Sequence, residues 1–142
     1  MTWDEYFLRI ADAVRLKSKD ASHKVGAVLV GPDHEIISTG YNGFARGIDE
    51  TDGSRWDRPA KYTWVIHAEN NAIYNAARRG IALRGSTLYV VAFGDGLCSS
   101  CARAVIQVGV MGVVVAEMEP TPESWRTDFD HAKGRAYLFR DC

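Results

Sequence analysis

Two apolar runs separated by one helix-length segment constrain the fold of this chain most. Residues 87–93 (Thr-Leu-Tyr-Val-Val-Ala-Phe) and 112–116 (Gly-Val-Val-Val-Ala) have the apolar composition of strands that are buried on both faces. Residues 99–108, which lie between them, have the pattern of a helix. Because strand, helix and strand in this order form a crossover unit with parallel strands, the chain is predicted to be an α/β protein.

The segments before this unit extend the same architecture. Apolar residues at helical spacing predict a helix over residues 3–17. Two further strands, over residues 24–30 and 35–39, flank a Gly-Pro-Asp turn and predict a hairpin. Residues 67–79 end in Arg-Arg-Gly, which is typical of a helix C-terminus. The element order predicts a three-layer α/β/α fold around a central mixed sheet of about five strands.

Two segments lack such a pattern. Residues 40–61 are rich in Gly, Asp and Arg, and a stretch of that length without apolar periodicity indicates a functional or a disordered loop. In the C-terminal part, Pro120 and Pro122 precede a segment for which we predict a helix from about Glu123 to Gly134. With 142 residues, the chain has the size of a single domain spanning residues 1–142.

Charge and hydropathy narrow the class of partner. Seventeen Lys and Arg against eighteen Asp and Glu give a net charge of −1, which argues against a polymeric nucleic-acid ligand. The longest apolar run is far shorter than the roughly 20 residues that span a bilayer, so no membrane segment is expected. The first residues carry acids instead of a basic and apolar leader, and three cysteines cannot form a disulfide framework. We therefore expect a cytoplasmic protein.

Three side chains that bind zinc readily stand at the starts of two predicted helices. His67 opens one helix, and Cys98 and Cys101 frame the entry to the other. Residues i and i+3 share a helix face, so two thiolates can reach one ion, and a helix N-terminus lowers their pKa. If two adjacent strands feed the two helices, both N-termini emerge at the same carboxyl edge of the sheet. Three protein ligands leave a fourth zinc position open to water, which is typical of catalytic zinc.

Glu69 supplies the group that such a zinc site needs for chemistry. It lies two residues after His67, and therefore on a different face of the helix. Its carboxylate is poorly placed to bind the same ion but can accept a hydrogen bond from a water molecule on that ion. This placement predicts a general acid/base that shuttles a proton.

Each half of this pattern is ambiguous on its own. A Cys-x-x-Cys pair also occurs in redox centres and in structural zinc sites. A structural zinc would need a fourth ligand, and the remaining candidates show no ligand spacing: His23, His34, His131 and Cys142. We expect each of these to be a surface or locally bonded side chain, and Cys142 to be a free thiol. Together and in this order, the two halves resemble the motif of zinc-dependent nucleobase deaminases.

Five stretches make the chain resemble, more narrowly, the deoxycytidylate (dCMP) deaminase family of the cytidine deaminase-like superfamily. The resemblance covers the chain from about residue 17 to residue 116. The matching stretches are Lys19–Ala27, Thr39–Phe44, Asp57–Tyr62, His67–Ile73 and Cys98–Arg103. The zinc motif is shared by the whole superfamily, whereas Gly-Tyr-Asn-Gly at residues 40–43 points to dCMP.

This resemblance implies zinc-dependent hydrolysis of dCMP to dUMP with release of ammonia, a product that would feed thymidylate synthesis. His67, Cys98 and Cys101 would bind the Zn²⁺ ion, and Glu69 would act as the general acid/base during attack on C4 of the cytosine. The resemblance also implies a homo-oligomer, often a hexamer, with a small nucleotide as the substrate.

Four further residues are implied to lie near the substrate: Ser22, Lys24, Asn42 and Ala68. Asn42 would hydrogen-bond the sugar, because an amide can both donate to and accept from a hydroxyl. Ser22 and Lys24 would lie near the phosphate, which a lysine neutralises as a point charge. An alternative stays open for two of these residues. Asn42 is also explained as a turn residue, because Tyr-Asn-Gly is typical of a tight turn, and Lys24 is also explained as a solvated surface lysine.

Leu97 departs from the family pattern, which has a proline directly before the first cysteine. A proline would restrict the angle at which the chain enters the helix, whereas Gly94-Asp95-Gly96 leaves that entry looser. The zinc ligands are all present, so zinc binding should survive. Whether the substrate geometry is altered, for example to accept a cytosine modified at its 5 position, stays open at this point.

Three other functions compete with this prediction. A deaminase of another small compound, such as a nucleoside or guanine, would need no phosphate contacts. A tRNA adenosine deaminase uses the same zinc motifs, but the absence of a basic stripe argues against it. A zinc-stabilised interaction protein without catalysis is disfavoured by the intact Glu69, because a structural zinc needs no proton shuttle.

Overall fold

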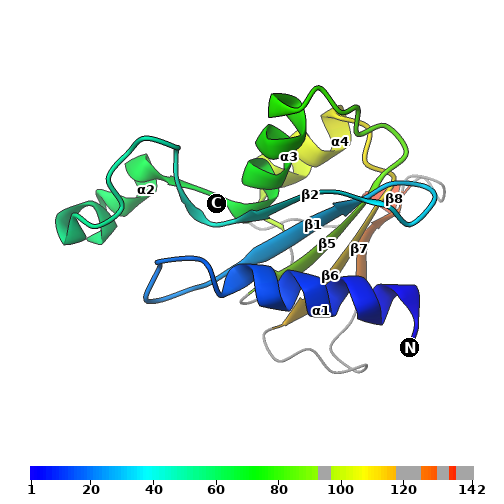
Figure 1. The fold of residues 1–142 in the computed structure, drawn as a ribbon, viewed down its shortest axis with the longest axis horizontal. Coiled ribbons are helices and arrows are strands. Elements are labelled where there is room, and N and C mark those ends of the chain that lie inside the picture. The colour runs from blue at the N-terminus through cyan, green and yellow to red at the C-terminus, as the bar shows by residue number, and fades with distance from the viewer. Residues whose placement is uncertain (93–96, 118–125, 131–134, 137–142) are drawn as a thin grey trace.

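A six-stranded mixed sheet forms the centre of the computed structural model, which describes residues 1–92, 97–117, 126–130 and 135–136 (Figure 1). Its strands are, in spatial order, β2 (Ile36–Tyr41), β1 (Gly26–Val30), β5 (Thr87–Ala92), β6 (Gly112–Glu117), β7 (Arg126–Asp130) and β8 (Arg135–Ala136). A separate two-stranded sheet pairs β3 (Gly43–Phe44) with β4 (Val65–Ile66). The helices are α1 (Trp3–Arg15), α2 (Lys61–Trp64), α3 (Ala68–Arg78) and α4 (Ser99–Gln107), with a 3-10 helix over Gly53–Trp56. None of these described helices is long and apolar enough to span a membrane.

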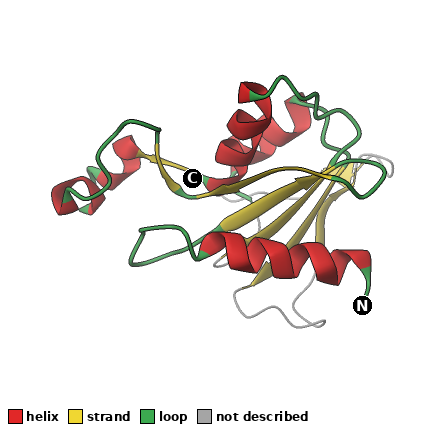
Figure 2. Cartoon of the chain, viewed as in Figure 1, coloured by secondary structure: helices red, strands yellow, loops and turns green. Residues whose placement is uncertain are grey.

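Helices cover both faces of this sheet (Figures 1 and 2). α1 lies on one face, where its buried residues Phe7, Leu8 and Ala11 pack against the strands. α3 and α4 lie on the other face, over a core that includes Leu29 and Val90. Successive residues of β1 and β5 enter opposite cores, because the side chains of a strand alternate between the two faces of a sheet. The predicted three-layer α/β/α fold is confirmed.

α3 approaches β2 so closely that the strand needs a glycine at residue 40. A Cβ atom on Gly40 would lie 2.3 Å from the backbone nitrogen of Ala72 and 2.4 Å from the carbonyl oxygen of Ala68. The hydroxyl of Ser38, two residues earlier on β2, donates a hydrogen bond to the carbonyl oxygen of Ala72 over 2.7 Å. The first half of α3 is thereby held against the sheet.

The crossover helices join strands that point the same way. β5 and β6 pair in parallel with α4 between them in the chain, as predicted. β1 is antiparallel to both β2 and β5, so β2 and β5 run in the same direction although β1 separates them. The expectation that two adjacent strands feed the two helices is therefore wrong. The hairpin inserts β1 between β2 and β5, and α3 directly follows the short β4 of the other sheet.

The C-terminal part contains a strand where the sequence predicts a helix. Residues 126–130, within the predicted helix 123–134, form β7 and pair antiparallel with β6. This pairing satisfies backbone groups along the outer edge of β6, and that long-range gain outweighs local helical preference. With β8, the sheet has six strands instead of about five. The described residues do not include Phe93, Gly94, Asp95, Gly96, His131 or Cys142.

The segment over residues 40–61 has more structure than the sequence predicts. It contains β3, the 3-10 helix and the first residue of α2. The ring of Phe44 stacks on that of Trp56 with centroids 4.4 Å apart, and Trp56 Nε1 donates a hydrogen bond to the carbonyl oxygen of Glu50 over 2.9 Å. Contacts of this kind have no period along the chain, so periodicity cannot detect the segment they order.

Candidate active site

The N-termini of α3 and α4 meet at the predicted zinc ligands. His67 is the N-cap residue of α3 and Cys98 is the N-cap residue of α4, each with an extended backbone that turns into the helix. Neither side chain caps its own helix. Cys101 lies one turn along α4 from Cys98, on the same face of the helix.

The three candidate ligand atoms converge. His67 Nδ1 lies 3.2 Å from Cys101 Sγ and 3.5 Å from Cys98 Sγ, and the donor atoms of all three residues lie within 4.8 Å of one another. A nitrogen and a sulfur that bind one tetrahedral zinc ion are about 3.6 Å apart, given the usual bond lengths to zinc. The separations and the nitrogen and sulfur donors therefore fit zinc, and His67, Cys98 and Cys101 are the residues positioned to hold it.

Leu97, at the position of the family proline, is 1% exposed and belongs to the core beneath α3 and α4. The residue before Cys98 is therefore held in place by core packing. A proline at this position would restrict the backbone through its ring instead. The convergence of the three ligands agrees with the expectation that zinc binding survives this substitution.

Glu69 lies in the first turn of α3 and is 6% exposed. Ala68, which separates it from His67, is fully buried. Within the described part of the chain, the group of side chains able to share one metal ion consists of His67, Cys98 and Cys101, without Glu69. This agrees with the expectation that Glu69 is not a ligand of the same ion.

Ser22 and Lys24 lie in the loop between α1 and β1. Ser22 is exposed, and its backbone N–H donates a hydrogen bond to Asp20 Oδ1 over 2.8 Å. Lys24 is half-buried, and its ammonium donates a hydrogen bond to the carbonyl oxygen of Ser18. Lys24 is thus held by its own loop instead of extending into solvent, and the phosphate role of both residues stays a prediction.

The amide of Asn42 joins this loop to the end of β2. Asn42 is 6% exposed, and its Oδ1 accepts a hydrogen bond from the backbone N–H of Val25 over 2.9 Å. Its Nδ2 donates to the carbonyl oxygen of His23 over 2.7 Å and to Asp20 Oδ2 over 3.3 Å. Both amide protons are thereby engaged, so a sugar contact would use the second lone pair of Oδ1. The sugar contact stays a prediction.

A buried ion pair between Asp20 and Lys61 was not foreseen from the sequence. Lys61 Nζ lies 2.7 Å from Asp20 Oδ2, and the two side chains are 8% and 4% exposed. Burial alone would raise the pKa of Asp20, but hydrogen bonds from Lys61 and from the backbone N–H groups of Ser22 and His23 hold that pKa below its ordinary value. An Asp two residues before a Ser is a local signal for the turn. Lys61 lies in a stretch that matches the deaminase family, but no local pattern there indicates that its side chain is buried.

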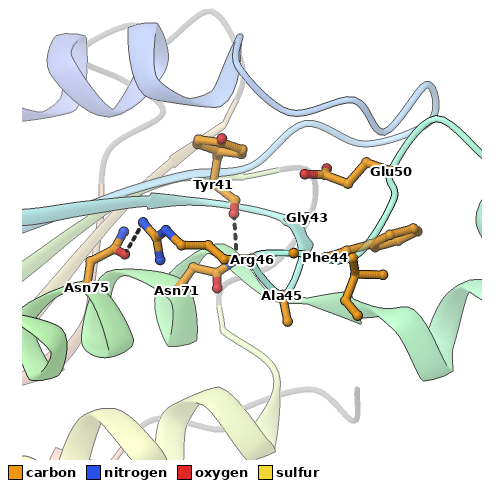
Figure 3. Close-up of a pocket in the computed structure, with 10 residues that line it drawn as sticks. Tyr41, Gly43, Phe44, Ala45, Arg46, Glu50, Asn71 and Asn75 are labelled. Carbon is orange, nitrogen blue, oxygen red and sulfur yellow. Dashed lines mark hydrogen bonds between the residues drawn. The ribbon is translucent and has the colours of Figure 1, made fainter.

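A pocket of about 130 Å³ lies beside α3, between the end of β2 and the chain that follows it (Figure 3). Arg46 donates a hydrogen bond to Asn75 Oδ1 over 2.7 Å, and Asn71 Nδ2 donates to the carbonyl oxygen of Tyr41 over 2.9 Å. Glu50 also lines the pocket, and its Oε2 is buried without a hydrogen-bond partner among the described residues. The three candidate zinc ligands are not part of this lining, to which α3 contributes Asn71 and Asn75, so the pocket is separate from the candidate metal site.

Comparison with known proteins places this geometry in a family. The family model of the cytidine and deoxycytidylate deaminase zinc-binding region matches residues 1–117. The chain belongs to this deaminase family. The match includes His67, Glu69, Cys98 and Cys101, so the zinc-binding region of the deaminases is the region in which the three ligands converge.

Two relatives and one solved structure agree with this family assignment. The chain is 44% identical over 115 residues to a probable deoxycytidylate deaminase of Caenorhabditis elegans, covering 78% of this chain and 55% of that protein. It is 37% identical over 120 residues to the deoxycytidylate deaminase of Mus musculus, covering 80% and 64%. The dCMP deaminase of cyanophage S-TIM5, solved in complex with dCMP and dUMP, is 27% identical with a TM-score of 0.65, covering 80% of this chain and 79% of that one. The chain spans less than two thirds of the length of the two animal relatives.

Proposed function

We propose that this chain catalyses the hydrolytic deamination of dCMP to dUMP with release of ammonia. The observation that carries the proposal is the convergence of His67, Cys98 and Cys101 at two helix N-termini, with Glu69 buried in the first turn of one of them. The names of the relatives and the nucleotides bound to the cyanophage enzyme support dCMP as the substrate.

Each part of the site has a task in this reaction. When bound, zinc supplies Lewis acidity that makes water a nucleophile near neutral pH. Glu69 would take one proton from the attacking water and deliver it to the ring nitrogen, and would then take the second proton from the new hydroxyl on C4 and deliver it to the amino group, which leaves as ammonia. One water is consumed and one ammonia is released, so the atoms balance without a redox cofactor.

Four residues are proposed to bind the nucleotide: Ser22, Lys24, Asn42 and Ala68. Lys24 has three donors, so it can keep its hydrogen bond to the carbonyl oxygen of Ser18 and still reach a phosphate oxygen. Ser22 is exposed on the same loop and offers a hydroxyl donor. Asn42 would accept a hydrogen bond from the deoxyribose hydroxyl, and Ala68 would contact the substrate next to Glu69.

The biological setting is proposed on the same basis. Residues 1–142 would form one deaminase domain within a homo-oligomer, which would have six subunits where it follows the family's common form. A reducing compartment such as the cytoplasm would keep the cysteines available to zinc. The dUMP produced would feed thymidylate synthesis. A net charge of −1 agrees with a small nucleotide in place of a nucleic-acid polymer.

A substrate panel tests this proposal. Zinc-loaded protein is incubated with dCMP, CMP, deoxycytidine, 5-methyl-dCMP and guanine, and ammonia release and the loss of cytosine absorbance are followed. Glu69→Ala serves as the catalytically dead control. We expect the highest kcat/KM with dCMP. Preference for deoxycytidine or guanine would overturn the assignment of the phosphate and sugar contacts. Preference for 5-methyl-dCMP would instead mean that Leu97 accompanies a changed base pocket.

A further inference from the structure

The Asp20–Lys61 ion pair joins two segments that are far apart in the sequence. Asp20 lies in the loop between α1 and β1, which also carries Ser22 and Lys24. Lys61 begins α2, which leads through β4 directly to the zinc ligand His67. The pair therefore connects the loop proposed to bind phosphate with the segment that delivers a metal ligand.

The carboxylate of Asp20 also organises its own loop. Its Oδ1 accepts hydrogen bonds from the backbone N–H groups of Ser22 and His23, over 2.8 and 3.2 Å. Its Oδ2 accepts from Lys61 over 2.7 Å and from Asn42 Nδ2 over 3.3 Å. A carboxylate with these four donors holds the loop backbone in a single conformation, and Lys61 supplies the opposite charge that compensates for the burial of the carboxylate.

A buried ion pair is weak evidence for stability, because an apolar pair of similar volume is often as stable. The Asp20–Lys61 pair instead fixes the position of the loop between α1 and β1, which has no regular secondary structure. The side chain of Lys61 is 8% exposed, and its ammonium is neutralised by Asp20. Lys61 is therefore not itself a group that contacts the substrate.

We propose that Lys61 is a positioning residue for the nucleotide phosphate: through Asp20 it clamps the loop of Ser22 and Lys24 against the segment that leads into His67. This inference rests on the proposed dCMP deamination. It assigns to the buried pair a role in recognising the phosphate end of the substrate, whereas the chemistry at C4 depends on Glu69 and the zinc ligands.

Steady-state kinetics of Lys61→Met test this role. The KM for dCMP should rise about tenfold or more while kcat changes little, because a contact to the phosphate binds ground state and transition state alike. The kcat/KM for deoxycytidine, which has no phosphate, should be unchanged. Lys61→Arg, which keeps the charge, should restore most of the lost affinity. Lys19→Met removes an exposed lysine next to Asp20 and should leave both substrates unaffected, which separates positioning from loss of charge.

A merely structural role would affect both substrates equally, or would lower kcat without changing the KM for dCMP, and either result would overturn the inference. If Lys61→Met does not fold, the double variant Asp20→Asn/Lys61→Met removes both buried charges and keeps an oxygen for the loop N–H groups, and the same split between dCMP and deoxycytidine is expected. Wild-type turnover of dCMP tests the proposed function separately, so the two ideas can fail independently.

Discussion

The carboxyl group of Glu69 is buried in the first turn of α3, two residues after the candidate zinc ligand His67. Glu69→Gln keeps the size of the side chain but cannot accept and return a proton. We expect kcat for dCMP to fall by about 10²- to 10⁴-fold, which is the usual contribution of a general acid/base. The zinc content should be unchanged, because the three ligands are intact. Ammonia release and metal analysis on the same preparation check both points, and retained turnover would remove Glu69 from the proton transfer.

Asp20 should make the protein sensitive to acid. Its pKa in the folded state lies below the ordinary value, because hydrogen bonds from Lys61 and two backbone N–H groups outweigh the effect of burial. The stability that it contributes is therefore fully present above its unfolded pKa, near 3.9, and is lost as the pH falls through the lower folded pKa. Asp20→Asn should flatten this acid branch of the stability curve.

The same variant leaves the buried ammonium of Lys61 without its charged partner. At pH 7 it should therefore lose about 3–5 kcal/mol of unfolding free energy. Denaturant unfolding of both proteins from about pH 7 down to about pH 2, a range that extends well below the unfolded pKa of an aspartate, measures the two effects together. Equal stability of the variant and the wild type at pH 7 would show that the pair carries little net energy.

For single residues, the sequence predicts the side chains that take part in the reaction better than the side chains that position them. The spacing of Cys98 and Cys101 and the position of His67 before a helix require only local geometry, and the structure brings all three together. Asp20 and Lys61 are 41 positions apart, and their contact depends on where two irregular segments are packed. No local pattern in the sequence encodes such a contact.

Among the elements, α3 depends most on a close contact, since it lies against β2 at Gly40. Gly40→Ala would place a methyl group 2.3 Å from the backbone nitrogen of Ala72, so strand or helix must shift. We expect a loss of about 1–3 kcal/mol in unfolding free energy, as for other overpacked sites. A shift of α3 would also displace His67 and Glu69, so kcat should fall.

Gly53→Ala is the matched control for that change. Gly53 is exposed, and a Cβ there would meet nothing within 4 Å. Its effect on stability should stay within about 0.5 kcal/mol. Thermal unfolding and turnover of both variants provide the measurement. If the two variants behaved alike, the close packing of α3 on β2 would not determine the geometry of the site.

Elements with a strong period or a continuous apolar run could be predicted, and elements ordered by tertiary contacts could not. α1, α3, α4, β1, β2, β5 and β6 all lie where the sequence predicts them, with ends that differ by a few residues. β7 was predicted as part of a helix, because its pairing with β6 is a long-range contact. β3 and β4 have two residues each, which is too short for any pattern.

On the scale of the whole molecule, zinc would add a link between two helices, α3 and α4, whose buried residues share one core. His67 and Cys98 are 31 positions apart and stand at the N-termini of different helices. An ion bound by the folded state and not by the unfolded one stabilises by about 2.7 kcal/mol when free zinc is 100 times its Kd. Chelation should therefore lower the Tm by roughly 10 °C and abolish turnover, and added Zn²⁺ should restore both.

Cys101→Ala separates this link from nonspecific effects of the chelator. The variant keeps only two ligands, so its Tm should already be low and should change little on chelation. If the wild type lost turnover on chelation but kept its Tm, the metal would serve the reaction without holding α3 and α4 together. In that case the preformed convergence of the three side chains would be maintained by the core beneath the two helices, where Leu97 and Ala102 are buried.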